Sequence, residues 1–183
     1  MRIISGNLRG RRLRAPDGLS TRPTSDRLRQ ALFNIISSDV PGSRFLDICA
    51  GSGAVGLEAL SRGAESAVFV EQSRRALALL EENIEHCGVQ TATKILPKEA
   101  VAALKGLAAG DQEFDIVFLD PPYDAGIYTQ ALRILGMSKL VAPEGLVVVE
   151  HRSRDKMPDE AGELRHYRSV THGESTLAFY ARV

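Results

Sequence analysis

From Ser43 to His151, short apolar runs alternate with segments of helical spacing, and this alternation constrains the fold more than any other feature. The clearest run, Phe114–Leu119, is almost continuously apolar, as central parallel strands are. The other runs predict strands at 44–50, 66–71, 92–96 and 145–151, and helices at 54–63, 73–88, about 99–105 and 128–137. Five such strands predict an open, doubly wound α/β sheet. Ligands bind these sheets beyond the carboxyl ends of the strands, near the switch in strand order.

The two ends of the chain depart from this alternation. Residues 163–183 predict two antiparallel strands joined at His172-Gly173, which completes a mostly parallel, Rossmann-like sheet of seven strands. Residues 2–18 mix short apolar pieces with Gly and Arg, and predict a small β-hairpin or an extended arm.

A helix is predicted to follow this N-terminal segment. Pro23 ends any earlier structure, and Thr24 or Ser25 can cap the helix. Apolar residues then recur at helical spacing, with polar ones on the other side: Leu28, Ala31, Leu32, Ile35 and Ile36 against Arg27, Arg29 and Gln30. We therefore divide the chain into an N-terminal arm and helix, residues 1–42, and an α/β domain, residues 43–183.

The composition indicates a cytoplasmic globular protein. A chain of 183 residues is long enough for one domain with a substantial core. No apolar stretch approaches the length of a transmembrane helix, and the N-terminus lacks the apolar core of a signal peptide. Cys49 and Cys87 lie far apart without metal-ligand spacing, which indicates reduced thiols. His151, His166 and His172 form no ligand pattern, so we expect them in surface or structural positions and expect no metal.

The net charge of zero hides an asymmetry along the chain. Residues 1–44 carry nine Arg and three Asp, a balance of +6, so residues 45–183 carry −6. A basic arm on an acidic body suits contacts with nucleic-acid phosphates. A solvated, arginine-rich surface would give the same charge distribution, and charge alone favours neither reading.

A glycine-rich segment follows the first strand of the predicted sheet. The residues from Gly51 to Gly56 fit G-x-G-x-x-G, and they lie between a strand and a helix, as a nucleotide-cofactor loop requires. Glu71 ends the second strand twenty residues after Gly51, where an acid binds a ribose diol. Two classes of cofactor therefore compete: a nicotinamide or flavin dinucleotide, and S-adenosylmethionine.

Asp47 separates these two classes. A pyrophosphate binds bare N–H groups at a helix N-terminus, and a carboxylate four residues before the glycines would repel it. S-adenosylmethionine carries an ammonium and a sulfonium instead, so an acid below the turn suits it, by direct contact or by fixing the loop. A structural role for Asp47, bonded to loop amides, is compatible with that assignment.

The central strand ends in Asp120-Pro121-Pro122-Tyr123, although proline cannot continue a strand. An exocyclic amino group on a base is a poor nucleophile because its lone pair is delocalised into the ring. The Asp120 carboxylate and the Pro121 carbonyl can accept hydrogen bonds from its two N–H groups. The prolines stiffen the turn that carries these two acceptors. Tyr123 can stack on a base that has left its helix. A plain turn with Asp124 as a helix cap is the structural alternative.

These four residues resemble the fourth motif of the amino-methyltransferases in the class I, S-adenosylmethionine-dependent superfamily. Three earlier segments, at 2–13, 21–36 and 46–64, are similar to one family: ribosomal RNA small subunit methyltransferase D, the bacterial 16S rRNA guanine-N2 methyltransferases. The resemblance runs from Arg2 to about Glu150 and is weakest between about 90 and 113. It implies a monomeric, cytosolic enzyme that methylates N2 of guanine 966 of 16S rRNA, with 30S particles or their assembly intermediates as substrate.

The resemblance also assigns residues. It implies cofactor-binding roles for Asp47, Ala50, Gly51, Ser52, Gly53, Glu71 and Asp120, and catalytic roles for Asp120, Pro121, Pro122 and Tyr123. Relatives often place Asp or Asn at the adenine of the cofactor, where this chain has Glu99 beside Lys98. Candidates for RNA contacts are Arg9, Arg11, Arg12, Arg14, Arg22, Thr24, Arg27 and Arg29. Asp26 either lies near the RNA, caps the helix or pairs with an Arg.

Three other functions remain open from the sequence. An adenine-N6 or other amino-methyltransferase on DNA or RNA would need a target-recognition insertion after Tyr123, where only about twenty residues precede the next strand. A non-catalytic RNA-binding or assembly factor would bind RNA without turnover. A dinucleotide-dependent oxidoreductase is disfavoured by Asp47 and by the Asp-Pro-Pro-Tyr turn.

Overall fold

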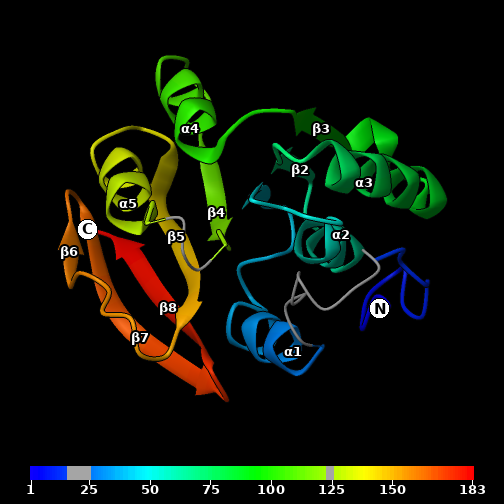
Figure 1. Ribbon diagram of the computed structural model, residues 1–183, viewed down its shortest axis with the longest axis horizontal. Helices are drawn as coiled ribbons and strands as arrows, with labels where there is room; N and C mark the ends of the chain where they lie inside the picture. The colour runs from blue at the N-terminus through cyan, green and yellow to red at the C-terminus, as the bar shows by residue number, and fades with distance from the viewer. Residues whose placement is uncertain (16–25, 123–125) are drawn as a thin grey trace.

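A single eight-stranded sheet organises the described residues, 1–15, 26–122 and 126–183, in the computed structural model (Figure 1). The strand order is β3-β2-β1-β4-β5-β8-β7-β6. The five strands from β3 to β5 pair in parallel, and β8, β7 and β6 add antiparallel pairs. Their bounds are β1 Arg44–Ile48, β2 Ser66–Val70, β3 Thr93–Leu96, β4 Phe114–Leu119, β5 Val141–Arg152, β6 Glu160–Ala161, β7 Leu164–His172 and β8 Ser175–Arg182. The predicted α/β sheet with a terminal hairpin is confirmed.

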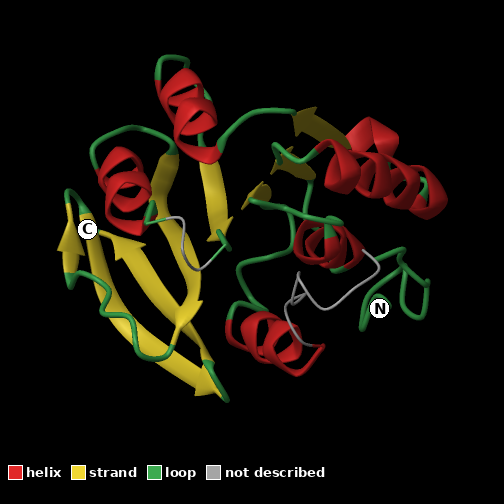
Figure 2. Ribbon diagram, viewed as in Figure 1, coloured by secondary structure: helices red, strands yellow, loops and turns green. Residues whose placement is uncertain are grey.

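Helices cover both faces of this sheet (Figure 2). Because strand side chains alternate between faces, Phe45 packs with the helices on one face, while its neighbour Leu46 packs with those on the other. The first face carries α1 (Asp26–Ile35), α2 (Ala54–Ser61) and α3 (Arg74–Cys87). The second carries α4 (Ala100–Ala108) and α5 (Tyr128–Gly136), and the 3-10 turn η1 (Gln90–Ala92) precedes β3. The doubly wound arrangement follows from this alternation.

Two features of the sheet differ from the prediction. The seven predicted strands become eight, because the two-residue β6 is too short to show any periodicity. Strand β5 begins at Val141 and not at Gly145, with a register shift against β4 between Phe114 and Ile116 and a positive φ of 63° at Glu144. The irregular stretch interrupts the apolar pattern, so the sequence showed only the regular half of the strand.

The N-terminal segment forms the hairpin that was one of its two predicted forms. Arg2 and Arg12 pair as an antiparallel bridge, and the Gly10 N–H donates to the Ile3 carbonyl. Ile3 and Leu13 are buried in the same apolar cluster as Phe45 of β1. The hairpin therefore packs on the body of the protein. The proposed helix caps Thr24 and Ser25 lie outside the described residues.

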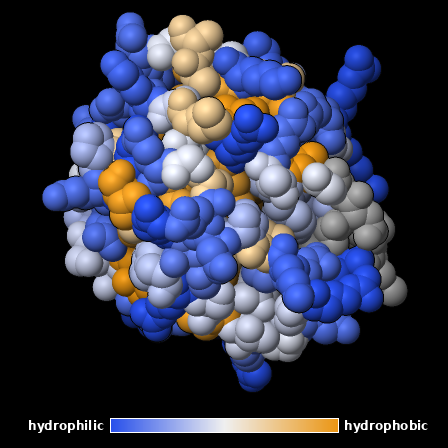
Figure 3. Space-filling view, turned by 90° about the vertical axis from the view of Figure 1, so that its left-hand side faces the viewer, coloured by the Kyte–Doolittle hydropathy of each residue, from blue (hydrophilic) through white to orange (hydrophobic). Residues whose placement is uncertain are grey.

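The opposite end of the molecule presents a polar surface. Figure 3 shows the side that lies on the left of Figure 1, where hydrophobic residues occur only in small, separated areas. Strand β7 has mostly exposed or half-exposed side chains there, and the short β6 pairs with only its first residues. A short, polar edge of this kind disfavours pairing with a second sheet. None of the described helices combines the length and apolar character needed to cross a membrane.

Candidate active site

The carboxyl ends of four neighbouring strands meet at one edge of the sheet. Ile48 of β1 lies level with Val70 of β2 and Leu119 of β4, and Val70 lies level with Leu96 of β3. The residues that follow these ends therefore gather in one region, as predicted for the switch in strand order. They are Cys49 to Gly53, Glu71, Glu99 and Asp120.

The pKa of the Cys49 thiol is raised by burial and by several carboxylates in this region. These are the carboxylates of Glu71, Asp120, Asp47 and Glu99. The four predicted acids thus act on one half-buried side chain. Such a concentration of negative charge suits a cationic ligand and would repel a pyrophosphate.

The loop after β1 turns sharply through left-handed backbone. Cys49 has φ 65°, Gly51 has φ 57° and Gly53 has φ 79°. A Cβ on Gly51 would meet nothing within 4 Å, so the loop backbone faces open space there. A Cβ on Gly56 would lie 2.4 Å from the Phe69 ring, which explains the close packing of α2 on β2. These glycines leave a backbone surface that a small molecule can approach.

Asp47 lies below this loop and is buried. Its Oδ2 accepts a hydrogen bond of 2.9 Å from the Gly56 N–H in the first turn of α2. Burial raises the pKa of Asp47 to about 7, although the hydrogen bond from Gly56 acts in the opposite direction. The described contact is the loop-fixing one among the two roles that the sequence allowed.

Glu71 connects the glycine loop to the start of α3. Its Oε2 accepts from the Gly51 N–H at 2.8 Å, and its Oε1 accepts from the N–H groups of Gln72 and Ser73 at 2.9 and 2.8 Å. Ser73 in turn caps α3. The residue is buried, so it is not the solvated acid that a strand end could also have carried. Its carboxylate is held at the crevice by three backbone donors.

Glu99 caps helix α4. Its two carboxylate oxygens accept from the N–H groups of Val101 and Ala102 at 2.9 and 2.8 Å. The longer side chain, which departed from the expected Asp or Asn, thus reaches the first turn of its own helix. Both Glu99 and Lys98 are exposed, and the proposed contact of Glu99 with an adenine stays a prediction.

The turn after β4 lies beside the glycine loop. The Asp120 N–H donates to the Ile48 carbonyl at 3.2 Å, which extends the β1–β4 ladder by one step. Asp120 is half-buried, Pro121 is buried and Pro122 is exposed. Tyr123 lies outside the described residues. The strand therefore delivers Asp120 and Pro121 to the edge where the four acids gather.

The predicted RNA-contacting arginines fall into two groups. Arg9, Arg11, Arg12 and Arg14 of the hairpin are exposed, as is Arg27 of α1, whereas Arg22 and Thr24 lie outside the described residues. Arg14 pairs with Glu82, and Arg11 donates to the His86 carbonyl, both on α3. The exposed side chains remain candidates for phosphate contacts.

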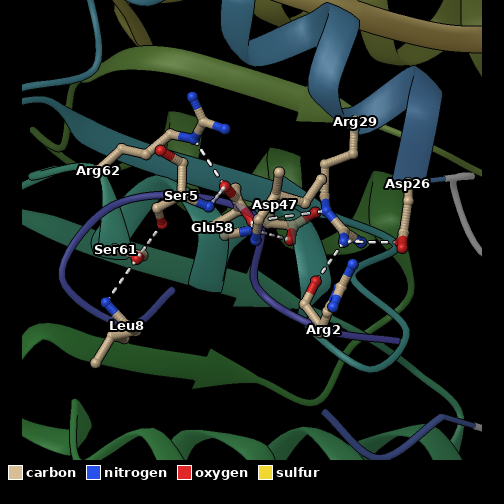
Figure 4. Close-up of polar contacts among 11 residues, drawn as sticks. Arg2, Ser5, Leu8, Asp26, Arg29, Asp47, Glu58, Ser61 and Arg62 are labelled. Carbon is tan, nitrogen blue, oxygen red and sulfur yellow. Dashed lines mark hydrogen bonds and ion pairs between the residues drawn. The ribbon is translucent and has the colours of Figure 1, made fainter. Parts of the chain in front are cut away.

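Arg29 corrects the prediction for this helix. It was placed on the polar side of α1 and among the RNA contacts, but its side chain is fully buried and cannot reach a phosphate. Its Nη2 donates to the Arg2 carbonyl at 2.7 Å and to Asp26 Oδ1 at 3.0 Å, and its Nε lies 3.8 Å from Glu58 Oε2 (Figure 4). The pairing of Asp26 with an Arg is thereby confirmed.

Glu58, which no sequence motif marks as a functional residue, binds the backbone of the N-terminal hairpin. It accepts from the N–H groups of Ile4 and Ser5 at 2.7 and 3.0 Å and from Arg62 Nε at 2.8 Å. Its only signal in the sequence was one acid in the otherwise apolar segment that forms α2. The buried pair of Arg29 and Glu58 thus joins the hairpin, α1 and α2.

His151 and the two cysteines do not form a metal-ligand set in the described parts of the chain. His151 is buried within β5, where its Nδ1 is 2.8 Å from the Arg152 carbonyl oxygen, and burial lowers its pKa. This agrees with the structural role expected for it. Both cysteines are free thiols. In the described parts of the chain, no group of three or more His, Cys, Asp or Glu side chains could hold a metal ion.

A parallel sheet with this strand order and an antiparallel end, a glycine loop after β1, an acid after β2 and Asp-Pro-Pro after β4 define a class I methyltransferase fold. The family described as Conserved hypothetical protein 95 matches residues 1–181. Ribosomal RNA small subunit methyltransferase D of Escherichia coli K12 is 34% identical over 182 residues, 100% of this chain and 90% of that protein.

Two further comparisons agree with this match. The Haemophilus influenzae protein of the same name is 35% identical over 152 residues, 82% of this chain and 78% of the relative. The solved structure of yhhF from Escherichia coli has a TM-score of 0.86 at 34% identity, and covers 100% of this chain and 97% of its own. The chain belongs to the ribosomal RNA small subunit methyltransferase D family.

Proposed function

We propose that this protein transfers the methyl group of S-adenosylmethionine to the exocyclic N2 of a guanine in 16S rRNA, at guanine 966, on 30S particles or an assembly intermediate. The observation that carries the proposal is the adjacency of Asp120-Pro121 to the glycine loop, through the backbone bond from Asp120 to Ile48. Family membership supports ribosomal RNA as the substrate, and the guanine is taken from the family resemblance of the sequence.

The residues of the crevice fit S-adenosylmethionine. The backbone from Ala50 to Gly53 faces open space at Gly51, and Glu71 offers a buried carboxylate of the kind that binds a ribose diol. Asp47, whose pKa burial raises to about 7, supplies part of a negative charge below the turn near neutral pH, and Asp120 adds charge from the neighbouring strand. Glu99, with or without Lys98, is the candidate for the adenine end. The ligand supplies a methyl group activated by a sulfonium sulfur.

The protein prepares the acceptor amino group. The Asp120 carboxylate and the Pro121 carbonyl accept hydrogen bonds from its two N–H groups. These bonds turn the nitrogen lone pair out of the ring plane toward the methyl carbon. A nitrogen–carbon bond forms as the sulfur–carbon bond breaks, and S-adenosylhomocysteine leaves. The methylated nitrogen then carries a positive charge and loses a proton to water. Pro122 stiffens the turn, and Tyr123 is proposed to stack on the base.

We propose that the reaction needs neither a metal ion nor a second subunit, and that the protein acts as a monomer in the cytoplasm. The exposed arginines Arg9, Arg11, Arg12 and Arg27, with Arg22 and Thr24, are proposed to contact the RNA. Arginine suits this role because its planar guanidinium binds phosphate with two parallel hydrogen bonds.

The decisive experiment supplies labelled S-adenosylmethionine with 30S subunits that lack their native modifications. Naked 16S rRNA and duplex DNA serve as parallel substrates, and the modified nucleoside is identified by mass. N2-methylguanosine from the 30S reaction is the expected product, and an Asp120→Ala variant should give none. N6-methyladenine would keep the chemistry of the turn but refute the guanine. RNA binding without any transfer would favour the non-catalytic assembly factor.

A further inference from the structure

A cavity of about 440 Å³ lies between the N-terminal hairpin and the first turns of α1. The function proposed above assigns two of its lining residues, Arg9 and Arg27, to general contacts with the RNA but gives the cavity itself no role. It shares no residue with the crevice at the strand ends. Its volume falls in the range of small-ligand sites, about 300–1,000 Å³. It is lined by Arg2, Ile3, Ile4, Arg9, Gly10, Asp26, Arg27 and Gln30.

The lining carries strong positive charge. Arg2, Arg9 and Arg27 are exposed at the cavity, and the single acid among the lining residues, Asp26, is paired with Arg29. Three arginines line this one cavity, and a guanidinium group can bind a phosphate through two parallel hydrogen bonds. Gln30 adds an amide that can both donate to and accept from the edge of a base.

The walls of this cavity are held in place from within the protein. Arg29 Nη2 bonds both the Arg2 carbonyl of one wall and the Asp26 carboxylate of the other (Figure 4). Glu58 accepts from the N–H of Ile4, a third lining residue, at 2.7 Å. Because both bonding side chains are fully buried, the cavity is organised before any ligand arrives.

We infer that this cavity is a nucleotide-binding subsite that holds one unpaired ribonucleotide of the substrate RNA, at a position other than the methylated guanine. The phosphate lies among the three arginines and the base lies against Gln30 and the isoleucine backbone. Single-stranded loops are recognised in this way, through splayed bases and their phosphates. The inference rests on the proposed RNA substrate and adds a second contact point on it.

Binding is tested first without any methyl transfer. Ribonucleoside 5′-monophosphates and inorganic phosphate are titrated separately while the backbone amide resonances are followed. The monophosphates are expected to shift the amides of Gly10, Arg27 and Gln30, and phosphate alone to shift them more weakly. If all four nucleotides leave these amides unchanged, the subsite is refuted.

Kinetics then separate the subsite from the catalytic turn. The double variant Arg27→Ala with Gln30→Ala should raise the KM for 30S subunits by about tenfold to a hundredfold, with kcat unchanged. Arg133→Ala removes the same charge from an exposed position of α5 and should leave KM unchanged. A normal KM in the double variant would overturn the subsite while the proposed function stands. Nucleotide binding at the cavity without methyl transfer to any RNA would keep the subsite and overturn the proposed function.

Discussion

The buried pair of Arg29 and Glu58 makes a quantitative prediction for the variant Glu58→Gln. Both side chains are fully buried, and Glu58 accepts three hydrogen bonds, from Ile4, Ser5 and Arg62. A glutamine retains one acceptor oxygen and places an NH₂ group against N–H donors. At least one of these part-buried donors then loses its partner; a buried donor left unsatisfied costs about 1–3 kcal/mol.

The charge lost from Glu58 adds to this cost. Arg29 would keep Asp26 but lose its only fully buried counterion among the described residues, and burial already lowers the pKa of its guanidinium. Removing one partner of a buried ion pair destabilises proteins by about 3–5 kcal/mol in total. For a chain of this length, each kcal/mol lowers the melting temperature by about 2–4 °C. We therefore expect Glu58→Gln to melt about 6–20 °C below the wild type.

The assay is thermal unfolding followed by circular dichroism, with urea unfolding for the free energy. Glu81→Gln, on an exposed position of α3, is the matched control and should stay within about 0.5 kcal/mol of the wild type. The double variant Arg29→Met with Glu58→Gln removes both charges and should lose less than the two single losses combined. A Glu58→Gln protein as stable as the control would show that the buried pair does not hold the hairpin.

Three further predictions concern the crevice and the N-terminal arm. Asp120→Ala should lower methyl transfer by about a hundredfold or more while S-adenosylmethionine binding, measured by calorimetry, stays nearly unchanged; an equal loss of both would contradict its role toward the acceptor. Replacing Arg11 and Arg12 by Ala should weaken RNA binding and flatten its dependence on salt, and an unchanged salt slope would exclude this part of the arm. Burial raises the pKa of Asp47 from 3.8 to about 7, so between these two pH values the folded protein binds a proton that the unfolded chain does not. The free energy of unfolding should therefore fall by about 1.4 kcal/mol for each unit that the pH rises from 3.8 to about 7, and stay level above about pH 7. Asp47→Asn should lack this part of the slope in urea unfolding, and an identical slope would refute the raised pKa.

The central sheet was predictable because its strands are buried on both faces. Phe114–Leu119 was predicted with its exact bounds, since an apolar run between polar residues leaves little freedom of register. The start of β5 was not, because the positive φ at Glu144 and the register shift have no periodic signature. Local pattern therefore specifies regular elements and misses the places where pairing is irregular.

The candidate site shows the same division. The positions of Asp47, Glu71 and Asp120 followed from strand ends alone, whereas their partners were not predictable from spacing. Arg29 is an example. It lies four residues before Phe33 on the buried face of α1, but a charged residue in an amphipathic helix is predicted to lie on the exposed, polar face. Its burial depends on Glu58, twenty-nine residues away, and no local pattern connects the two.

Helix α2 connects the two regions on which the proposals depend. The Gly56 N–H in its first turn donates to Asp47 below the glycine loop. Two residues further, Glu58 binds the backbone of the hairpin, and Ser61 at the helix end accepts from the N–H of Leu8 at 2.9 Å. Eight residues thus hold the crevice and the hairpin against one rigid element. The spacing between the arginine-lined cavity and the Asp120-Pro121 turn therefore depends on these hydrogen bonds. Under the proposed function, loosening Glu58 should disturb RNA recognition even though the Glu58 side chain is fully buried.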